Sequence, residues 1–185
     1  MSKTYLVVNA LGYYACWFAC ILGAVAGLWF AGPLVVAAFI AVHLSKVSDR
    51  PREGLFLAAC AGGGFVLDTA LAAAGMYRFH LNDVAPEWMS PLWMVALWPA
   101  FGATMNASMR FMRGKLALLA VFGGVGGPLA YFAGWRLGAV EIGEPLWMAM
   151  AALAVAWAVA TPLLMWGATR HDPWRAPEGA AAAAP

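Results

Sequence analysis

The residue best placed to do chemistry is Asp68, an acidic residue in the middle of a long apolar stretch. An ionised carboxylate in hydrocarbon is costly unless it is partnered, protonated or placed in a wet cavity. Its neighbours at helical spacing are all small: Ala61, Gly64, Ala72 and Gly75. Small residues let another helix approach closely. We therefore expect Asp68 to point into a helix bundle. There it serves as a general acid or base, as a proton-coupling group, or as a hydrogen-bonded residue that fixes helix packing (helix glue).

Three further residues are expected near the depth of Asp68. At about 1.5 Å per helical residue, Asp68 lies about 21 Å and Tyr131 about 22 Å from the inner membrane surface, and Trp98 falls close to the same layer. Arg136 lies about 10 Å nearer the outside, with a side chain long enough to reach down. We predict one ligand pocket built from Asp68, Trp98, Tyr131 and Arg136, with Asp68 as the candidate catalytic residue. Aromatic packing and interface anchoring stay open as alternatives for the other three.

A second set of polar residues is predicted near the inner surface. Its members are Asn9, His43 and Asn106, with Thr161 as a further candidate. Hydrogen bonds between such groups in different helices contribute about 0.6 kcal/mol each on average. Helix glue is therefore the simplest role for this inner polar cluster, while His43 has the alternative role of a proton shuttle.

The sequence contains no motif for a metal, a cofactor or a known catalytic order. The three cysteines lie in apolar runs, without a CxxC pair or a Cys/His cluster. The glycine-rich run 123–127 is not a phosphate loop, because no Lys-Ser/Thr follows it. A net charge of +2 gives no indication of nucleic-acid binding. We expect no metal, no cofactor and no nucleic acid, and whether the chain is an enzyme stays open.

The elements that position these residues are membrane helices. Hydrophobic residues make up 64% of the chain and charged residues 11%, against roughly 25% charged residues in soluble domains, so the bilayer must act as the solvent. We predict an all-α polytopic protein without a soluble domain: a bundle of about six transmembrane helices over residues 1–170 and a disordered Ala/Pro tail over 171–185. The expected spans lie near 5–29, 33–46, 54–77, 91–110, 116–135 and 146–169.

Positive charge is unevenly distributed over these spans. Nine of the eleven Lys and Arg residues fall on one side: Lys3, Lys46, Arg50, Arg52, Arg110, Arg113, Lys115, Arg170 and Arg175. The opposite side holds Arg78 and Arg136. Because Lys and Arg are enriched in cytoplasmic loops, this asymmetry predicts that both termini are cytoplasmic.

Several segments together resemble a known family. They are residues 17–24, Asp68, residues 91–93 with 97–98, and residues 127–134 leading into 136–139. With these segments the chain resembles the bacterial inner-membrane family called domain of unknown function family 2878, over roughly residues 5–168. The resemblance implies a multi-pass protein of the bacterial inner (cytoplasmic) membrane, and it implies no activity.

The leading functional hypothesis is binding or processing of a lipidic ligand in an intramembrane pocket around Asp68, because such a pocket would open within an apolar bundle. Two alternatives stay open: a proton-coupled transporter of small molecules or lipids, and a structural accessory subunit of a membrane complex. The expected partners are membrane lipids and the lipidic ligand. A membrane-protein partner and a homo-oligomer also stay open.

The charge asymmetry makes a testable topology prediction. Reporter fusions at Asp49 and after Arg170 should give a cytoplasmic signal, and a fusion at Asp83 should give a periplasmic signal. A periplasmic signal after Arg170 would contradict the six-span topology and would point to the short second span as the miscounted one.

Overall fold

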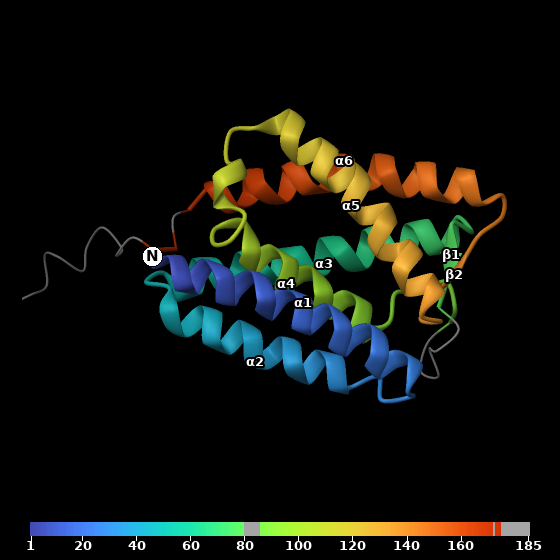
Figure 1. Ribbon diagram of the computed structural model, residues 1–185, viewed down its shortest axis with the longest axis horizontal. Helices are drawn as coiled ribbons and strands as arrows, with labels where there is room; N and C mark the ends of the chain where they lie inside the picture. Colours follow the sequence, from blue (N-terminus) through green and yellow to red (C-terminus); the bar gives the residue numbers. More distant parts are fainter. Residues whose placement is uncertain (80–85, 172, 175–185) are drawn as a thin grey trace, which may run out of the picture.

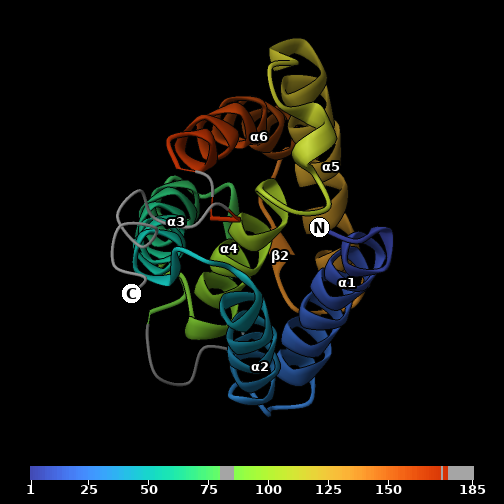
Figure 2. The same cartoon turned by 90° about the vertical axis from the view of Figure 1, so that its left-hand side faces the viewer.

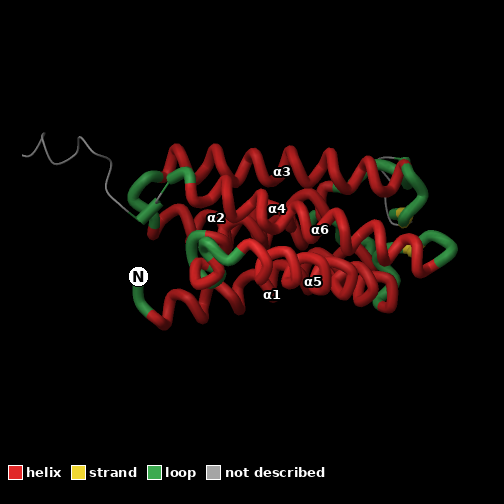
Figure 3. The backbone as a smooth tube through the Cα atoms, turned by 90° about the horizontal axis from the view of Figure 1, so that it is seen from above, coloured by secondary structure: helices red, strands yellow, loops and turns green. Residues whose placement is uncertain are grey.

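The computed structural model describes residues 1–79, 86–171 and 173–174. These described residues form six α-helices, one 3-10 helix and two very short strands. In chain order these are α1 (Lys3–Val25), α2 (Ala31–Lys46), α3 (Arg50–Ala73), β1 (Tyr77–Arg78), α4 (Leu92–Met105), η1 (Arg110–Met112), α5 (Leu116–Arg136), β2 (Glu141–Ile142) and α6 (Leu146–Thr169). The helices run roughly along one axis (Figure 3). We call the end where α1 begins and α6 ends the terminal end, and the end with β1 and β2 the ribbon end (Figure 1).

The helices have the length and the surface of membrane spans. Four of them, α1, α3, α5 and α6, are long and apolar enough to cross a membrane, while α2 and α4 are shorter apolar helices. Large apolar side chains such as Leu11, Leu55 and Val121 are exposed on the outside of the bundle, where lipid would cover them. The prediction of an all-α, polytopic membrane protein with six helices is confirmed.

Helix α3 begins one turn earlier than expected, at Arg50 instead of residue 54. Asp49 caps it, because its side chain accepts a hydrogen bond from the backbone N–H of Arg52 at 3.2 Å. Pro51 suits the first turn, where its missing N–H has no helical partner to lose. As a consequence, Glu53 belongs to the helix and is fully buried, although the sequence analysis had placed it in a loop.

Other boundaries differ by a few residues. α1 ends at Val25 and α2 starts at Ala31, so the turn between them is earlier than the expected break at residues 30–32. α4 ends at Met105 and not at residue 110, because the chain turns through η1 before α5. α5 and α6 agree with the expected spans to within one residue.

The chain remains in contact with the bundle beyond α6. The carbonyl of Pro173 accepts hydrogen bonds from the backbone N–H groups of Ser48 and Asp49 at 2.7 and 3.2 Å. Trp174 Nε1 donates to the carbonyl of Asn106 at 2.9 Å. The expected tail therefore does not begin at residue 171. Its residues 172 and 175–185 lie outside the described residues, as does Asp83 of the topology test.

Helix α4 occupies the centre of the bundle. It lies between the α1–α2 pair and α3, with α6 on its far side, while α5 packs along α6 (Figure 2). Ten of its residues are buried, from Trp93 to Met105. The α5–α6 contact is close because α5 presents glycine: a Cβ at Gly123 or Gly127 would overlap atoms of Trp157.

A short ribbon closes the ribbon end. Gly75 (φ 78°) follows α3 and Gly138 (φ 88°) follows α5, and both adopt the left-handed conformation that glycine enters without steric cost. The two reversals direct β1 and β2 into an antiparallel pair in which Tyr77 faces Ile142. The ribbon thereby places the Tyr77 side chain beside α3, where Asp68 lies.

The close approach of α3 and α4 can be tested at two adjacent glycines. A Cβ at Gly64 would overlap the indole of Trp98, whereas a Cβ at Gly63 would meet no atom within 4 Å. Gly64→Leu should therefore destabilise the fold by at least the roughly 1–3 kcal/mol that is typical of overpacking. This loss should appear as a clearly lower melting temperature in detergent. The matched control Gly63→Leu should melt like the wild type. Equal melting temperatures for the two variants would contradict this packing.

Candidate functional site

Asp68 is the acceptor of three hydrogen bonds from three different elements. It is fully buried on α3. Oδ1 accepts from the hydroxyl of Tyr77 on the ribbon at 3.0 Å and from the hydroxyl of Tyr131 on α5. Oδ2 accepts from Trp98 Nε1 on α4 at 2.7 Å. Both carboxyl oxygens are thus occupied, which is how a polar group becomes tolerable at this depth.

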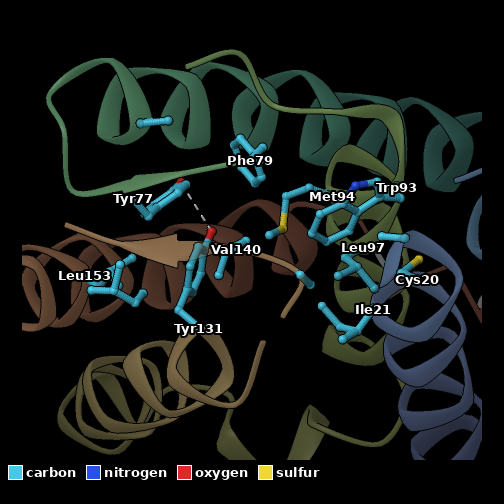
Figure 4. Packing of buried hydrophobic residues seen from close by; sticks show 14 of the residues in the cluster. Cys20, Ile21, Tyr77, Phe79, Trp93, Met94, Leu97, Tyr131, Val140 and Leu153 are labelled. Carbon is cyan, nitrogen blue, oxygen red and sulfur yellow. Dashed lines mark hydrogen bonds between the residues drawn. The ribbon is translucent and has the colours of Figure 1, made fainter. Parts of the chain in front are cut away.

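Tyr77 is held in place by several groups at once. Its hydroxyl also lies 3.0 Å from the carbonyl oxygen of Asp68 and 3.5 Å from the hydroxyl of Tyr131. Figure 4 shows the two tyrosine hydroxyls pointing toward one another. Burial, and then the neighbouring Asp68 carboxylate, hold the pKa of Tyr77 well above its ordinary value. Tyr77 therefore stays protonated and remains a hydrogen-bond donor.

Local sequence explains why Trp98 reaches Asp68. Gly64 and Asp68 are four residues apart and share one face of α3. Because Gly64 has no side chain, the Trp98 indole can lie directly against this face. The indole N–H is then within reach of the carboxyl oxygen one turn further along α3.

The structure brings together three of the four predicted pocket residues: Asp68, Trp98 and Tyr131. Arg136 does not join them. It is the last residue of α5 and is exposed at the surface of the bundle. A guanidinium group at a helix end keeps its hydration by pointing outward, so reaching down toward Asp68 would be costly. Tyr77, which the sequence analysis did not single out, supplies the third donor instead.

A cavity of about 450 Å³ lies beside this network, between α1, α4, α5 and α6. Trp98 and Tyr131 form part of its wall, so Asp68 lies behind the wall and not inside the cavity. The lining is uncharged and rich in aromatic side chains, among them Tyr13, Trp17, Phe101 and Trp157. Such a cavity suits an apolar molecule of drug or lipid size.

The rim of the cavity lies on the outside of the bundle. Four of its lining residues are large and exposed: Tyr14 and Phe18 on α1, and Phe122 and Leu129 on α5. α1 and α5 lie on the same side of the molecule (Figure 2). The cavity therefore opens sideways between these two helices, toward the region that lipid would occupy, and not along the bundle axis.

A second polar site closes the terminal end. Glu53 is fully buried, and its two carboxyl oxygens accept from His43 Nε2 at 2.8 Å and from His171 Nε2 at 2.5 Å. The Nδ1 atom of His43 lies 2.9 Å from the hydroxyl of Tyr5. These four residues join α1, α2, α3 and the segment after α6. Among the described residues, no group of three or more His, Cys, Asp or Glu side chains could hold a metal ion.

Asn9 and Asn106 lie near this end and form hydrogen bonds with residues other than His43. Asn9 Oδ1 accepts from Ser108 Oγ at 2.7 Å. Asn106 Nδ2 donates to the carbonyl of Ala168 at 3.0 Å, and its Oδ1 accepts from Arg113. The predicted inner cluster is therefore divided into separate hydrogen-bonded groups, each of which ties a loop or helix end to a neighbouring helix.

Four residues of the two polar sites escaped the sequence analysis: Tyr77 at Asp68, and Tyr5, Glu53 and His171 at the terminal end. The signal for Glu53 was the capping residue Asp49 followed by Pro51, a typical helix start that draws residue 53 into the bundle. The signal for Tyr77 was weaker. Gly75 indicates a helix end, but nothing local shows that the following residues pair with Ile142 and return to Asp68.

The donor pattern at Asp68 predicts a specific response to substitution. In Asp68→Asn the amide oxygen can still accept from both tyrosines, but its NH₂ group would face the Trp98 N–H, donor against donor. We expect the fold to persist with a loss of about 1–3 kcal/mol. Asp68→Leu should cost more, because Trp98 and Tyr131 lose their acceptor and Tyr77 keeps only the backbone carbonyl of residue 68.

A double-mutant cycle isolates the Trp98 contact. Trp98→Phe removes the opposing donor, so Asp68→Asn should cost about 1 kcal/mol less in the Trp98→Phe background than alone. The measurement is the free energy of unfolding in detergent for all four proteins. Strictly additive costs would show that Trp98 and Asp68 are not coupled.

The comparisons with known proteins give one match. A family model described as Protein of unknown function (DUF2878) matches residues 6–163. No curated protein and no solved structure gives a significant match. The matched region includes Asp68 with its three donors and the whole cavity lining, whereas His171 and Trp174 lie beyond it.

Proposed function

The chain belongs to the DUF2878 family, and we propose that it binds a lipid within the membrane. The observation that carries the proposal is the cavity of about 450 Å³ with an uncharged, aromatic lining and a rim on the lipid-facing side of α1 and α5. Its volume falls within the range of roughly 300–1,000 Å³ that ligand sites occupy.

The chemistry of the lining favours a lipid over a water-soluble solute. A polar solute would have to give up its hydrogen bonds to water on entering an aromatic cavity, at a cost of several kcal/mol. An acyl or isoprenoid chain has no hydrogen bonds to water to give up, because it comes from an apolar bilayer. It can enter sideways between α1 and α5, past Phe18 and Phe122, without crossing an aqueous phase.

Asp68 acts in this proposal as a positioning residue. Its oxygens already accept from Tyr77, Tyr131 and Trp98, and two of these side chains separate it from the cavity. A ligand in the cavity would therefore meet Trp98 and Tyr131 before it could exchange a proton with Asp68. Its contribution is to fix the wall residues Trp98 and Tyr131, which favours binding over acid–base catalysis.

We place the protein in the bacterial inner membrane with both termini in the cytoplasm. Nine of eleven Lys and Arg residues support this orientation through the positive-inside rule. The common location of the start of α1 and the end of α6 is compatible with it (Figure 1). The Glu53 network would then face the cytoplasm and the ribbon the periplasm.

The proposal can be tested by filling the cavity. Gly126 lines the cavity, and a Cβ there would meet no atom within 4 Å, so Gly126→Phe should fold with its ring in the space of the ligand. Gly62→Phe is the matched control, since Gly62 is an exposed α3 residue with equally free surroundings. Lipid that stays with each protein after detergent washing is identified and quantified by mass spectrometry.

Wild type and Gly62→Phe should retain the same lipid, in an amount approaching one molecule per chain. Gly126→Phe should lose most of it while keeping its melting temperature. Retention of that lipid by Gly126→Phe at the wild-type level, or the absence of any retained lipid in the wild type, would refute the proposal.

A further inference from the structure

Two unpaired hydrogen-bonding groups lie in the wall of the cavity. Thr161 and Trp157 both line it, and Thr161 is fully buried. Within the part of the chain that the structure describes, the buried atoms Thr161 Oγ1 and Trp157 Nε1 have no hydrogen-bond partner. They are four residues apart on α6 and therefore share one helix face.

Unpaired groups at this depth call for an explanation. A helical threonine commonly satisfies its hydroxyl by bonding the carbonyl four residues earlier, yet Thr161 does not. Buried polar groups in lipid are normally paired, because no water is available to them. An indole N–H is a donor only, so the group that it lacks is an acceptor.

The surrounding residues hold the pair in a fixed position. On one side the bare backbone of α5 abuts it, since a Cβ at Gly123 would overlap Thr161 and a Cβ at Gly127 would overlap the Trp157 indole. On the other side Trp157 stacks on Trp98, with ring centroids 4.8 Å apart and planes 12° from parallel. Because Trp98 is bonded to Asp68, the Asp68 network also sets the plane of Trp157.

We infer that Thr161 and Trp157 bind the carbonyl oxygen of an uncharged lipid, an inference that rests on the proposed lipid-binding function. Both can donate, and a carbonyl oxygen has two lone pairs to accept from them. Among the residues that the structure describes, the lining contains no charged side chain, so a phosphate or a carboxylate would be buried without compensation. An ester and a quinone are two sources of such a carbonyl.

The rest of the ligand has room along α5. The lining continues from Gly123 to Gly134, which is about 16 Å along a helix axis. Over this length α5 contributes only glycine, alanine and leucine besides Tyr131, whose hydroxyl is bonded to Asp68. The carbonyl end would lie nearer the terminal end of the bundle, and the hydrocarbon chain would point toward the ribbon end.

The test compares lipid probes that carry different polar groups. Methyl oleate carries an ester carbonyl, decylubiquinone carries quinone carbonyls, 1-octadecene carries neither, and oleate carries a charge. Binding of each probe to the full-length protein is measured at a fixed detergent concentration. Thr161→Val removes the hydroxyl at nearly constant shape, Thr161→Ser retains it, and Thr169→Val is the control, since the Thr169 hydroxyl is exposed and bonds the Trp166 carbonyl.

Wild type should bind at least one carbonyl probe more tightly than 1-octadecene, and oleate no more tightly than 1-octadecene. Thr161→Val should weaken binding of the carbonyl probe about fivefold, as expected for one lost hydrogen bond. It should leave binding of 1-octadecene unchanged. Thr161→Ser and Thr169→Val should behave like the wild type. The probe whose binding is weakened shows whether the bound carbonyl belongs to an ester or to a quinone.

Equal binding of carbonyl probes and 1-octadecene, a preference for oleate, or no effect of Thr161→Val would overturn the inference and leave lipid binding intact. Binding of no probe, with no retained native lipid, would remove the proposed function as well. A measurement on the wild type alone guards against misfolding of the variants. The infrared carbonyl band of bound ¹³C-labelled methyl oleate, or of labelled decylubiquinone, should be shifted as by hydrogen bonding, and unshifted bands for both would overturn the inference.

Discussion

The buried carboxyl group of Asp68 is the constraint on which the arrangement of this bundle depends. A carboxyl group in hydrocarbon must obtain hydrogen bonds from protein, since lipid supplies none. Asp68 obtains them from Tyr77, Trp98 and Tyr131, and these donors come from the ribbon, α4 and α5. One side chain of α3 thereby fixes three other elements relative to itself. Removing Trp98 would leave Oδ2 without a donor, whereas Oδ1 accepts from two tyrosines and would keep one of them.

The cavity follows from this constraint. Trp98 and Tyr131 are held at Asp68 by their polar atoms, and both side chains form part of the cavity wall. Trp98 in turn orients Trp157 by stacking. At the terminal end, Glu53 draws His43 and His171 together and packs the segment after α6 against the bundle. With the ribbon at one end and this network at the other, the open direction is sideways, between α1 and α5.

Much of this architecture was predictable from the sequence because the bilayer imposes simple rules. Apolar run lengths gave the six helices, and a rise of 1.5 Å per residue placed Trp98 and Tyr131 at the depth of Asp68. Depth counting does not report direction, however. Depth alone could not show that Arg136 points outward, because its side chain is long enough to reach either the surface or the layer of Asp68. The position of Tyr77 could not be predicted for another reason: it depends on pairing with Ile142, 65 residues later in the chain. Thr161 was noted as polar, but its lack of a partner is a property of tertiary packing.

The central claim is that the Asp68 network maintains a lateral cavity occupied by a lipid. The most direct measurement is an experimental structure of the protein extracted with its native lipids into nanodiscs. The account predicts elongated density that enters between α1 and α5, runs past Tyr131 and ends at Thr161 and Trp157, with Tyr77, Trp98 and Tyr131 bonded to Asp68. A cavity collapsed by contact between α1 and α5, or a water-filled passage from the terminal end to the ribbon end, would contradict it.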